Sequence, residues 1–553
     1  MNFFDLILFL LVFAVFLFAI ISKIKKISFR ADFLIYLAPL VFSIVHLIVC
    51  GLNYFLIPVM ISTVFIPLLY PAKKRWLSFV PVALLSAVLA LASVLLPVSE
   101  NMQNYASFSY VDSFNKLNTY LENVYPLADH KKVDFSMKYT QFLPQFEVAQ
   151  RNQDKKAYFQ ALSDYIASFS DAHMVSYPAD VFLGLSFSKE EFLGWRESDL
   201  GGDLGFATIR TDDGRAVAVA VDENSDVYAA GLRVGNEILT VDGREIAEVA
   251  QEIPMVFAPQ GSADAANRLI LQHMMIGRCP VGNRVTITFS KEDGSVVEAT
   301  LVAVQKDYNA LKETFDTLLQ AEPETVEDLY SFQVLESQTG YMRIGTMEYE
   351  DEAVILKQVE EDLANFANGG GENLILDVRQ NGGGEDTFGA KLKGLFTDKK
   401  DFYLTESVLD QKTGQLVAES TITVEPKFAG FDGQIIILVN AGSASAAEGF
   451  AYNMAELSNV SVAGMMGSNG SFGTMTDGFV LLPDNFLLIF PKIACVDENG
   501  RVMIDADASG FGGVKPDIKI PIDDAAIDSL FVQHVDYELN FVLEYLNTGK
   551  TAE

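Results

Sequence analysis

The segment Ile435–Leu457, "IIILVNAGSASAAEGFAYNMAEL", changes character in its middle. Its β-branched start predicts a buried strand, and the apolar spacing after Ser445 predicts a helix. Small residues fill the junction between them. The first amides of a helix lack intrahelical partners and carry partial positive charge. A serine oxygen at Ser445 would therefore lie beside free N–H donors, which can stabilise an alkoxide or an oxyanion.

Ser445 has two interpretations. Ser445-Ala446-Ala447-Glu448 fits a capping box, in which the serine only begins a helix and Glu448 is its partner. A nucleophile at a sharp strand-to-helix turn is the alternative. The second interpretation gains support from "LDVRQNGGG", which ends at Gly384 and supplies a loop of free amides after another predicted strand.

The chain from 307 to 553 alternates between predicted strands and helices. Such alternation predicts a layered α/β domain with its site at the carboxyl ends of the strands. The glycines Gly382–Gly384 are not followed by Gly-Lys-Ser/Thr, so they do not form a phosphate-binding loop of the Walker type. No Cys/His cluster of the sequence has metal-ligand spacing. We therefore expect neither a cofactor nor a metal.

Two further domains are predicted before this core. Helical apolar spacing indicates a small helical bundle within 100–199, and short strands with turn signals fill 200–306. In the second region, "AAGLRVGNEILTVDG" resembles a PDZ domain, a generic small β-domain being the alternative. "DLGF" lies where that family binds a peptide's terminal carboxylate. The resemblance implies that Leu204, Gly205 and Phe206 bind a substrate tail.

The first 99 residues read as a membrane domain. Four apolar runs, at about 3–21, 33–50, 54–70 and 77–97, each approach the length that spans a bilayer. Basic residues follow the first and third runs, which places those loops in the cytoplasm and the rest of the chain outside. We therefore expect a multi-pass protein of a bacterial cell membrane, held in the lipid bilayer by four transmembrane helices. The net charge of −33 disfavours nucleic acid as a partner.

Four motifs occur in the order seen in the C-terminal processing peptidases and the tricorn core protease, which the region from Phe114 to Pro521 resembles. They are "YMRIGTM", "LILDVRQNGGG", "ILVNAGSASAAEGFA" and "GVKPDIKIP". The resemblance implies a multidomain serine peptidase with a helical region, a PDZ domain and an α/β core of the ClpP/crotonase type. It also implies that Ser445 is the nucleophile. The oxyanion donors would be the amides of Ala446 and Gly383, with Gly382 beside them.

The general base of this chain differs from that of the simpler members of this family, which use a lysine. Their lysine would fall in Gly464–Gly478, which contains none. The tricorn branch instead uses a histidine before the PDZ domain, and "FSDAHMV" places His173 there. An imidazole can take the serine proton near neutral pH, although His173 could also be a structural residue of the bundle. Ala172 replaces a serine of tricorn. Where tricorn has its orienting glutamate, shortly before the last motif, this chain has only Asp505 and Asp507 near Gly510, and we assign Asp507 as the third catalytic residue.

The sequence therefore predicts a membrane-anchored serine endopeptidase that cleaves protein or peptide substrates outside the cytoplasm. A catalytically inactive scaffold that binds peptides is the alternative, because the lysine and the serine before His173 are missing. A transporter with a regulatory outer domain is disfavoured, since the predicted spans hold no buried charge beyond His46.

Overall fold

The computed structural model describes residues 102–182, 189–253, 262–306, 309–320, 329–335, 338–474 and 478–548. The chain divides into two compact units, one of residues 1–104 and 179–185 and the other of 105–178 and 186–553. In the first unit, the described residues form β1 (Gln103–Asn104) and α8 (Ala179–Phe182). All other elements belong to the second unit.

The prediction of a membrane domain is corrected here. The four predicted spans lie outside the described residues. Among the residues that are described, no helix is both long and apolar enough to cross a membrane. The transmembrane helices of the predicted fold class, the bilayer as a partner and the multi-pass location are therefore not supported, and the fold described is a mixed α/β fold.

The second unit contains a six-stranded sheet in the order β12-β13-β14-β17-β18-β22. β12 and β13 pair antiparallel, and every later neighbour in this order pairs parallel, as the strand–helix alternation predicted. The strands are β12 (Tyr330–Val334), β13 (Thr339–Ile344), β14 (Asn373–Asp377), β17 (Gln434–Leu438), β18 (Val460–Gly464) and β22 (Ile518–Lys519).

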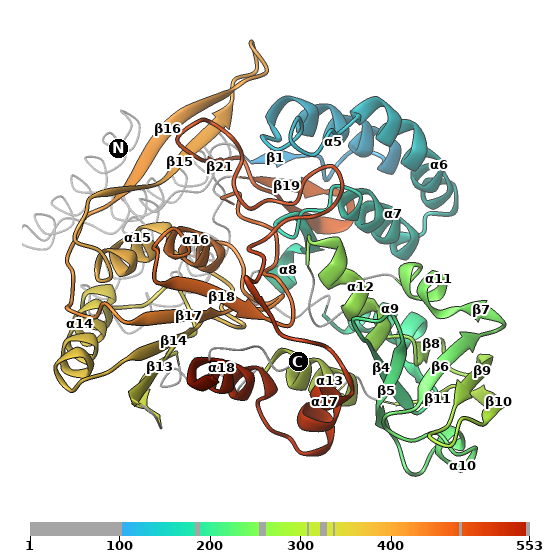
Figure 1. Cartoon of the computed structure of the whole chain (residues 1–553). Helices are drawn as coiled ribbons and strands as arrows, with labels where there is room; N and C mark the ends of the chain where they lie inside the picture. The colour runs from blue at the N-terminus through green and yellow to red at the C-terminus, as the bar shows by residue number, and fades with distance from the viewer. Residues whose placement is uncertain are drawn as a thin grey trace, which may run out of the picture. The chain divides into compact units, whose positions relative to one another are not determined.

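Helices cover both faces of this sheet (Figure 1). Side chains alternate between the faces, so Leu374 and Leu376 pack on one side and Ile375 on the other. The first face is covered by α14 (Glu352–Asn368), α15 (Asp386–Gly394) and α16 (Ala446–Met454). The second is covered by α13 (Asn309–Leu319), α17 (Asp524–Ile527) and α18 (Tyr537–Thr548).

The helical region begins its helices with polar caps. The side chains of Ser109, Asp134 and Asp154 each accept a backbone N–H of the helix that follows. Its core is aromatic, and the rings of Phe114 and Phe146 stack with centroids 4.0 Å apart. The helices are α5 (Tyr110–Val124), α6 (Phe135–Asn152), α7 (Lys155–Ala167) and α9 (Lys189–Leu200).

The region predicted to resemble a PDZ domain holds a six-stranded antiparallel sheet, in the order β10-β9-β6-β5-β4 with β7 paired to β6. Its strands are β4 (Phe206–Arg210), β5 (Ala216–Val221), β6 (Glu237–Val241), β7 (Arg244–Glu245), β9 (Arg284–Ser290) and β10 (Val296–Val302). Its helices are α10 (Asp226–Ala229), α11 (Ile246–Gln251) and α12 (Ala265–Met274). Beside it, β3 (Gly202–Asp203) pairs with β8 (Arg278–Cys279) and β11 (Val304–Gln305).

Two smaller sheets complete the unit. In one, β15 (Asp401–Leu409) pairs with β16 (Leu416–Val424) and β21 (Ala494–Val496). In the other, β20 (Phe486–Ile489) pairs with β19 (Phe479–Leu482) and β2 (Val175–Pro178). A 3₁₀ turn (Pro483–Asn485) and a π turn (Asp528–Val532) are also present. Because β2 begins two residues after His173, its pairing with β20 ties the end of the helical region to the core.

Candidate active site

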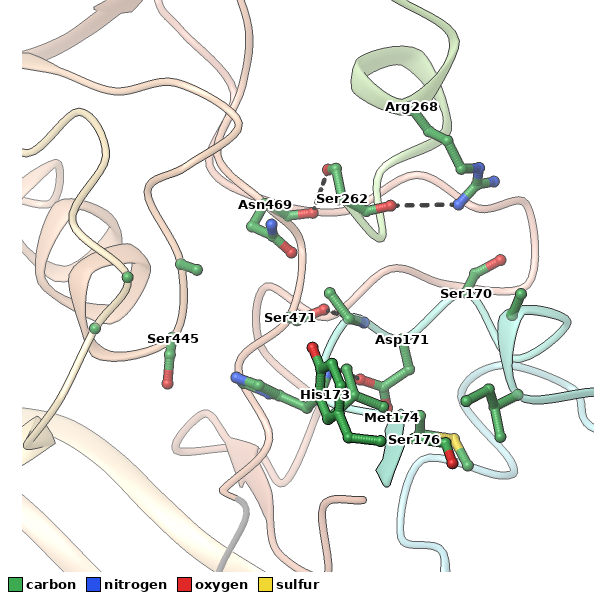
Figure 2. Close-up of a pocket in the computed structure, with 18 of the residues that line it drawn as sticks. Ser170, Asp171, His173, Met174, Ser176, Ser262, Arg268, Ser445, Asn469 and Ser471 are labelled. Atoms are coloured by element: carbon green, nitrogen blue, oxygen red, sulfur yellow. Dashed lines mark hydrogen bonds between the residues drawn. The ribbon is translucent and has the colours of Figure 1, made fainter. Parts of the chain in front are cut away.

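A cavity of about 1280 Å³ brings together the residues that the sequence singled out. Ser445, His173 and the glycines Gly382–Gly384 all line it. Ser445 lies at the start of the helix α16, His173 in the loop before β2, and the glycines in the loop after β14. Figure 2 shows Ser445 and His173 on facing sides of this pocket. Residues from three distant parts of the chain therefore share one site.

Ser445 occupies a strained turn. It precedes α16 with φ 55° and ψ −129°, a conformation that costs energy for any residue but glycine. Gly383 lies directly against it: a Cβ added to Gly383 would lie 2.6 Å from the Ser445 Cβ. Only glycine fits at this position, so the glycine loop brings its backbone into contact with the serine.

Glu448 holds the turn in place. Its buried carboxylate accepts N–H groups of Ser445, Gly470 and Ser471 at 3.1, 2.7 and 3.1 Å. The hydroxyl of Ser468 donates to the same carboxylate at 2.5 Å. Burial raises the pKa of Glu448 to about 8, although these hydrogen bonds oppose the rise. Glu448 therefore does more than cap α16, because it pins loop 468–471 to the Ser445 turn.

Ser443 has a structural role. Its buried hydroxyl donates to the carbonyl of Val378 at 2.7 Å and accepts the N–H of Asn440 at 3.1 Å. Both partners lie at the ends of neighbouring parallel strands. This serine ties the ends of β14 and β17 together.

The amides near Ser445 differ in availability. Ala446 begins α16, and its N–H has no partner within the described part of the chain. The N–H of Gly383 already donates to Oδ1 of Asn381 at 2.9 Å. The N–H of Gly382 has no partner among the described residues, and Gly382 is exposed to the cavity. Of these three amides, those of Ala446 and Gly382 have no partner among the described residues.

His173 is 8% exposed, and its Nδ1 is buried without a partner in the described residues. Its backbone N–H donates to Asp171 Oδ1 at 2.9 Å, and the Tyr125 hydroxyl donates to Asp171 Oδ2 at 2.6 Å. Burial lowers the pKa of His173, whereas the charge of Asp171 raises it and that of Lys131 lowers it. The imidazole is therefore held neutral, as a base requires.

The loop of His173 is joined to loop 468–471, which Glu448 holds. The N–H of Ala172 donates to the Ser471 hydroxyl at 2.8 Å (Figure 2). Ser471 in turn donates its own N–H to Glu448. The residue that departs from the tricorn pattern, Ala172, therefore supplies a backbone contact that does not depend on its side chain.

Residues 338–520 match the model of peptidase family S41. The matched residues contain Gly382, Gly383 and Ser445, and this finding supports a serine peptidase. The fold is similar to that of mature CPAF, alone and in complex with lactacystin, at 16% and 14% identity and a TM-score of 0.51 for both. Each match covers 80% of this chain and 99% of the other. The photosystem II D1 C-terminal processing protease also matches, at 15% identity and a TM-score of 0.36, over 76% of this chain and 97% of the other. A comparison with curated proteins finds no match.

Asp507, assigned as the third catalytic residue from the resemblance to the tricorn core, does not line the cavity. Asp507 is exposed, and its carboxylate accepts the N–H and the hydroxyl of Ser509 in a surface turn. Asp505 is only 4% exposed, accepts the N–H of Phe472 at 3.0 Å, and has Oδ2 buried without a partner in the described residues. Burial raises the pKa of Asp505 to about 7. Asp505 does not line the cavity either, so its burial alone favours it over Asp507.

Asp171 was missed by the sequence analysis. It lines the cavity, is buried and is the carboxylate whose charge acts on His173. Its position two residues before the histidine is the only sequence signal, and such a signal does not distinguish a buried aspartate from a surface one.

The loop expected to bind a substrate tail does not line the Ser445 cavity. The N–H of Leu204 donates to the carbonyl of Gly277 at 2.9 Å, and that of Gly205 donates to Asp203 at 2.6 Å. A Cβ added to Gly277 would lie 2.0 Å from the carbonyl oxygen of Phe206. These amides are already engaged within the domain, and tail binding there stays a prediction.

Within the described ranges, no three residues of His, Cys, Asp or Glu are grouped so that they could hold a metal ion.

Proposed function

We propose that the protein is a serine endopeptidase that cleaves protein or peptide chains, with Ser445 as nucleophile and His173 as general base. The observation that carries this proposal is the Ser445 turn, where a strained serine at a helix start shares a cavity with a buried neutral histidine. The match to peptidase family S41 supports the same reaction class.

The reaction follows from these groups. The Ser445 hydroxyl attacks the peptide carbonyl while His173 takes its proton. The oxyanion that forms accepts hydrogen bonds from the N–H of Ala446 and from the glycine loop, through Gly382 or through Gly383 if that amide leaves Asn381. The imidazolium gives its proton to the leaving amine, and an ester to Ser445 remains. Water then attacks this ester, with His173 again as base, and restores the serine.

The carboxylate that supports His173 is assigned to Asp171, with Asp505 nearby. Asp171 is the acidic group whose charge raises the pKa of His173. The charges of Asp171 and Lys131 act on Asp505. Its carboxylate accepts the N–H of Phe472, the residue after Ser471. A negative charge in this position stabilises the imidazolium that forms during attack.

Recognition of substrate tails by the PDZ-like region would require a rearrangement. The amides of Leu204 and Gly205 would have to exchange Gly277 and Asp203 for a terminal carboxylate. We propose that any such recognition is coupled to movement of the segment around Gly277. A second proposal, the inactive scaffold, has no separate observation in its favour.

The test compares full-length wild type with Ser445→Ala, His173→Ala and Ser443→Ala on unfolded protein substrates, with fragments identified by mass spectrometry. We expect Ser445→Ala and His173→Ala to lose cleavage by about 10³-fold or more. Ser443→Ala should keep it, because that hydroxyl only joins two strand ends. Retained cleavage in folded Ser445→Ala would overturn the proposal, and so would the absence of cleavage by folded wild type.

A further inference from the structure

The strand β2 has one unpaired edge beside the Ser445 cavity. Among the described residues its sheet has the order β1-β19-β20-β2, so β2 is a terminal strand that pairs only with β20. The cavity is lined by four consecutive residues, Met174, Val175, Ser176 and Tyr177. Because neighbouring side chains of a strand point to opposite faces, a cavity over one face would be lined mainly by alternate residues. The cavity therefore meets β2 along its free edge.

The hydrogen-bond register shows which main-chain groups point to this edge. The N–H of Phe490 donates to the carbonyl of Gly478 at 2.9 Å, which continues the pairing of β20 with β19. In antiparallel strands, opposite residues alternate between bonded and unbonded pairs, so the main-chain groups of the next residue, Ile489, point to β2. Ile489 lies opposite Val175. The residue after Val175, Ser176, therefore turns its N–H and its carbonyl away from β20.

These outward main-chain groups have no partner. Neither the N–H nor the carbonyl of Ser176 takes part in a hydrogen bond within the described part of the chain, although the residue is only 6% exposed. A buried main-chain group without a partner is costly. Pro178, the next residue with this orientation, has no N–H to leave unpaired, which is typical of a strand edge. Ser176 therefore presents one donor and one acceptor that a second extended chain would satisfy.

We propose that a substrate chain binds in extended form along the free edge of β2 and exchanges main-chain hydrogen bonds with Ser176. This inference rests on the proposed function and names how the same site holds its substrate. The added strand is recognised through groups that every peptide carries. Binding at this edge therefore tolerates many substrate sequences, and the side chains on either side of the cut bond are selected elsewhere.

The position of Ser176 relates this edge to the bond that is cut. Ser176 follows His173 by three residues, and Figure 2 shows both of them on the side of the pocket that faces Ser445. An extended chain advances about 3.3 Å per residue, so Ser176 lies roughly 10 Å along the strand from the base. The substrate residue that pairs with Ser176 therefore lies about three residues from the cut bond.

The first test changes the peptide and leaves the edge intact. Peptides of about ten residues, tiled along reduced and carboxymethylated lysozyme, are ranked by calorimetric binding to full-length Ser445→Ala. The tightest binder is then resynthesised with one main-chain amide at a time N-methylated. We expect methylation to weaken binding about 10-fold at alternate amides and to have little effect between them, because only every second N–H of a strand faces its neighbour.

The second test removes the donor from the protein. Ser176→Pro deletes the outward N–H and spares the pairing with β20, since proline is tolerated at such positions of an edge strand. We expect kcat/KM for the same peptide to fall about 10-fold through KM. Labelling of Ser445 by an alkyl fluorophosphonate should not change, because this small reagent has no main chain to pair.

Glu298→Pro is the matched control for a proline on a strand edge. Glu298 is exposed on β10, the terminal strand of another sheet, and does not line the cavity. Its N–H also points outward, because the N–H of Lys291 donates to the carbonyl of Ser295 and the pairing of β10 with β9 alternates from there. Glu298→Pro should therefore leave kcat/KM unchanged.

Three results would overturn the inference. They are the failure of every peptide to bind, N-methylation that weakens binding without alternation, and a normally labelled Ser176→Pro protein that cuts as well as Glu298→Pro. If Ser176→Pro does not fold, which loss of labelling would reveal, the N-methylated series decides alone. Alternating sensitivity in a protein whose wild type cuts nothing would support the inference while the endopeptidase proposal fails. Cleavage that depends on Ser445 without alternation would support the endopeptidase and overturn the added strand.

Discussion

At the scale of single residues, Ser445 and Gly383 depend on each other. The serine is held at a positive φ, and the glycine contacts it so closely that no side chain fits. The strain at Ser445 persists because Glu448 accepts its N–H. The same contacts that hold this unfavourable backbone also aim the hydroxyl at the cavity.

Asp171 offers the sharpest test of the histidine's environment. Its charge opposes the lowering of the His173 pKa by burial, so Asp171→Asn should lower that pKa further. Because the neutral imidazole is the base, the acid limb of the kcat/KM profile should move to lower pH. The plateau should fall about 10-fold or more, since the imidazolium loses its counter-charge.

The matched control for this prediction is Asp507→Asn. Asp507 is exposed and bonds only within its own surface turn, so the change should leave kcat/KM within about twofold, as surface substitutions usually do. A larger effect of Asp507→Asn than of Asp171→Asn would restore the assignment made from the sequence and contradict the geometry.

Sequence spacing predicted some residues of the site and could not predict others. Ser445, Gly382, Gly383 and His173 stand in ordered motifs, and the structure places all of them in one cavity. Asp505 and Asp507 are two residues apart in one loop, so spacing cannot distinguish them. Only burial does: one carboxylate is enclosed and the other faces solvent.

At the scale of elements, the site is formed by loops that follow the carboxyl ends of parallel strands. The alternation of strands and helices predicted this core, and the paired register of β14 and β17 brings the glycine loop beside the Ser445 turn. The predicted domain limits stay a prediction.

Loop 467–470 was not predictable, because its partners come from distant segments. The Asn267 side chain of α12, in the PDZ-like region, donates to the carbonyls of Gly467 and Ser468 at 3.0 and 2.9 Å.

Glu448 is the residue on which this loop depends. Glu448→Gln leaves one carbonyl oxygen for three N–H donors and a hydroxyl, and turns an NH₂ group toward them. We expect a loss of about 3 kcal/mol in the free energy of unfolding, measured with urea, and about a 100-fold loss of kcat. Glu425→Gln is the control, since its exposed pair with Lys400 should be worth less than about 0.5 kcal/mol. Equal effects of the two substitutions would show that Glu448 does not hold the turn.

At the scale of the whole molecule, buried acids make stability depend on pH. The folded protein holds Asp386 and Asp505 with pKa about 7, whereas the unfolded chain loses these protons near pH ~4. Between pH 6.5 and 8.5 the folded state therefore binds more protons, and its stability falls as pH rises. Each group contributes at most about 1.4 kcal/mol per pH unit.

Urea unfolding at pH 6.5, 7.5 and 8.5 checks this prediction. The midpoint should decrease across the series, and Asp386→Asn should reduce the slope. The folded pKa of His173 is lowered and that of His273 is lowered to about 4, whereas the unfolded chain binds these protons near pH ~6.5. Both histidines therefore oppose the decrease at the acid end of the series and contribute nothing at pH 8.5. A midpoint that rises with pH would contradict the burial of these carboxyl groups in their protonated form.

The membrane prediction illustrates a limit of sequence patterns at this scale. Apolar runs of suitable length in the first 99 residues predicted four spans, and these runs lie outside the described residues. Among the residues that are described, no helix is long and apolar enough to cross a membrane. A hydropathy pattern measures only how apolar a segment is and how long it is. The α/β core was predicted more successfully because strand periodicity, turn glycines and ordered motifs all indicated the same fold.

The most direct measurement of the central claim is covalent labelling of the full-length protein with an alkyl fluorophosphonate, followed by mass spectrometry of the peptides. This reagent phosphonylates a serine only when a base activates it. We predict a single adduct, on Ser445, that is lost in His173→Ala and unaffected by Ser443→Ala. An adduct on Ser443 or Ser471, or labelling of Ser445 at the same rate without His173, would contradict a Ser445–His173 peptidase.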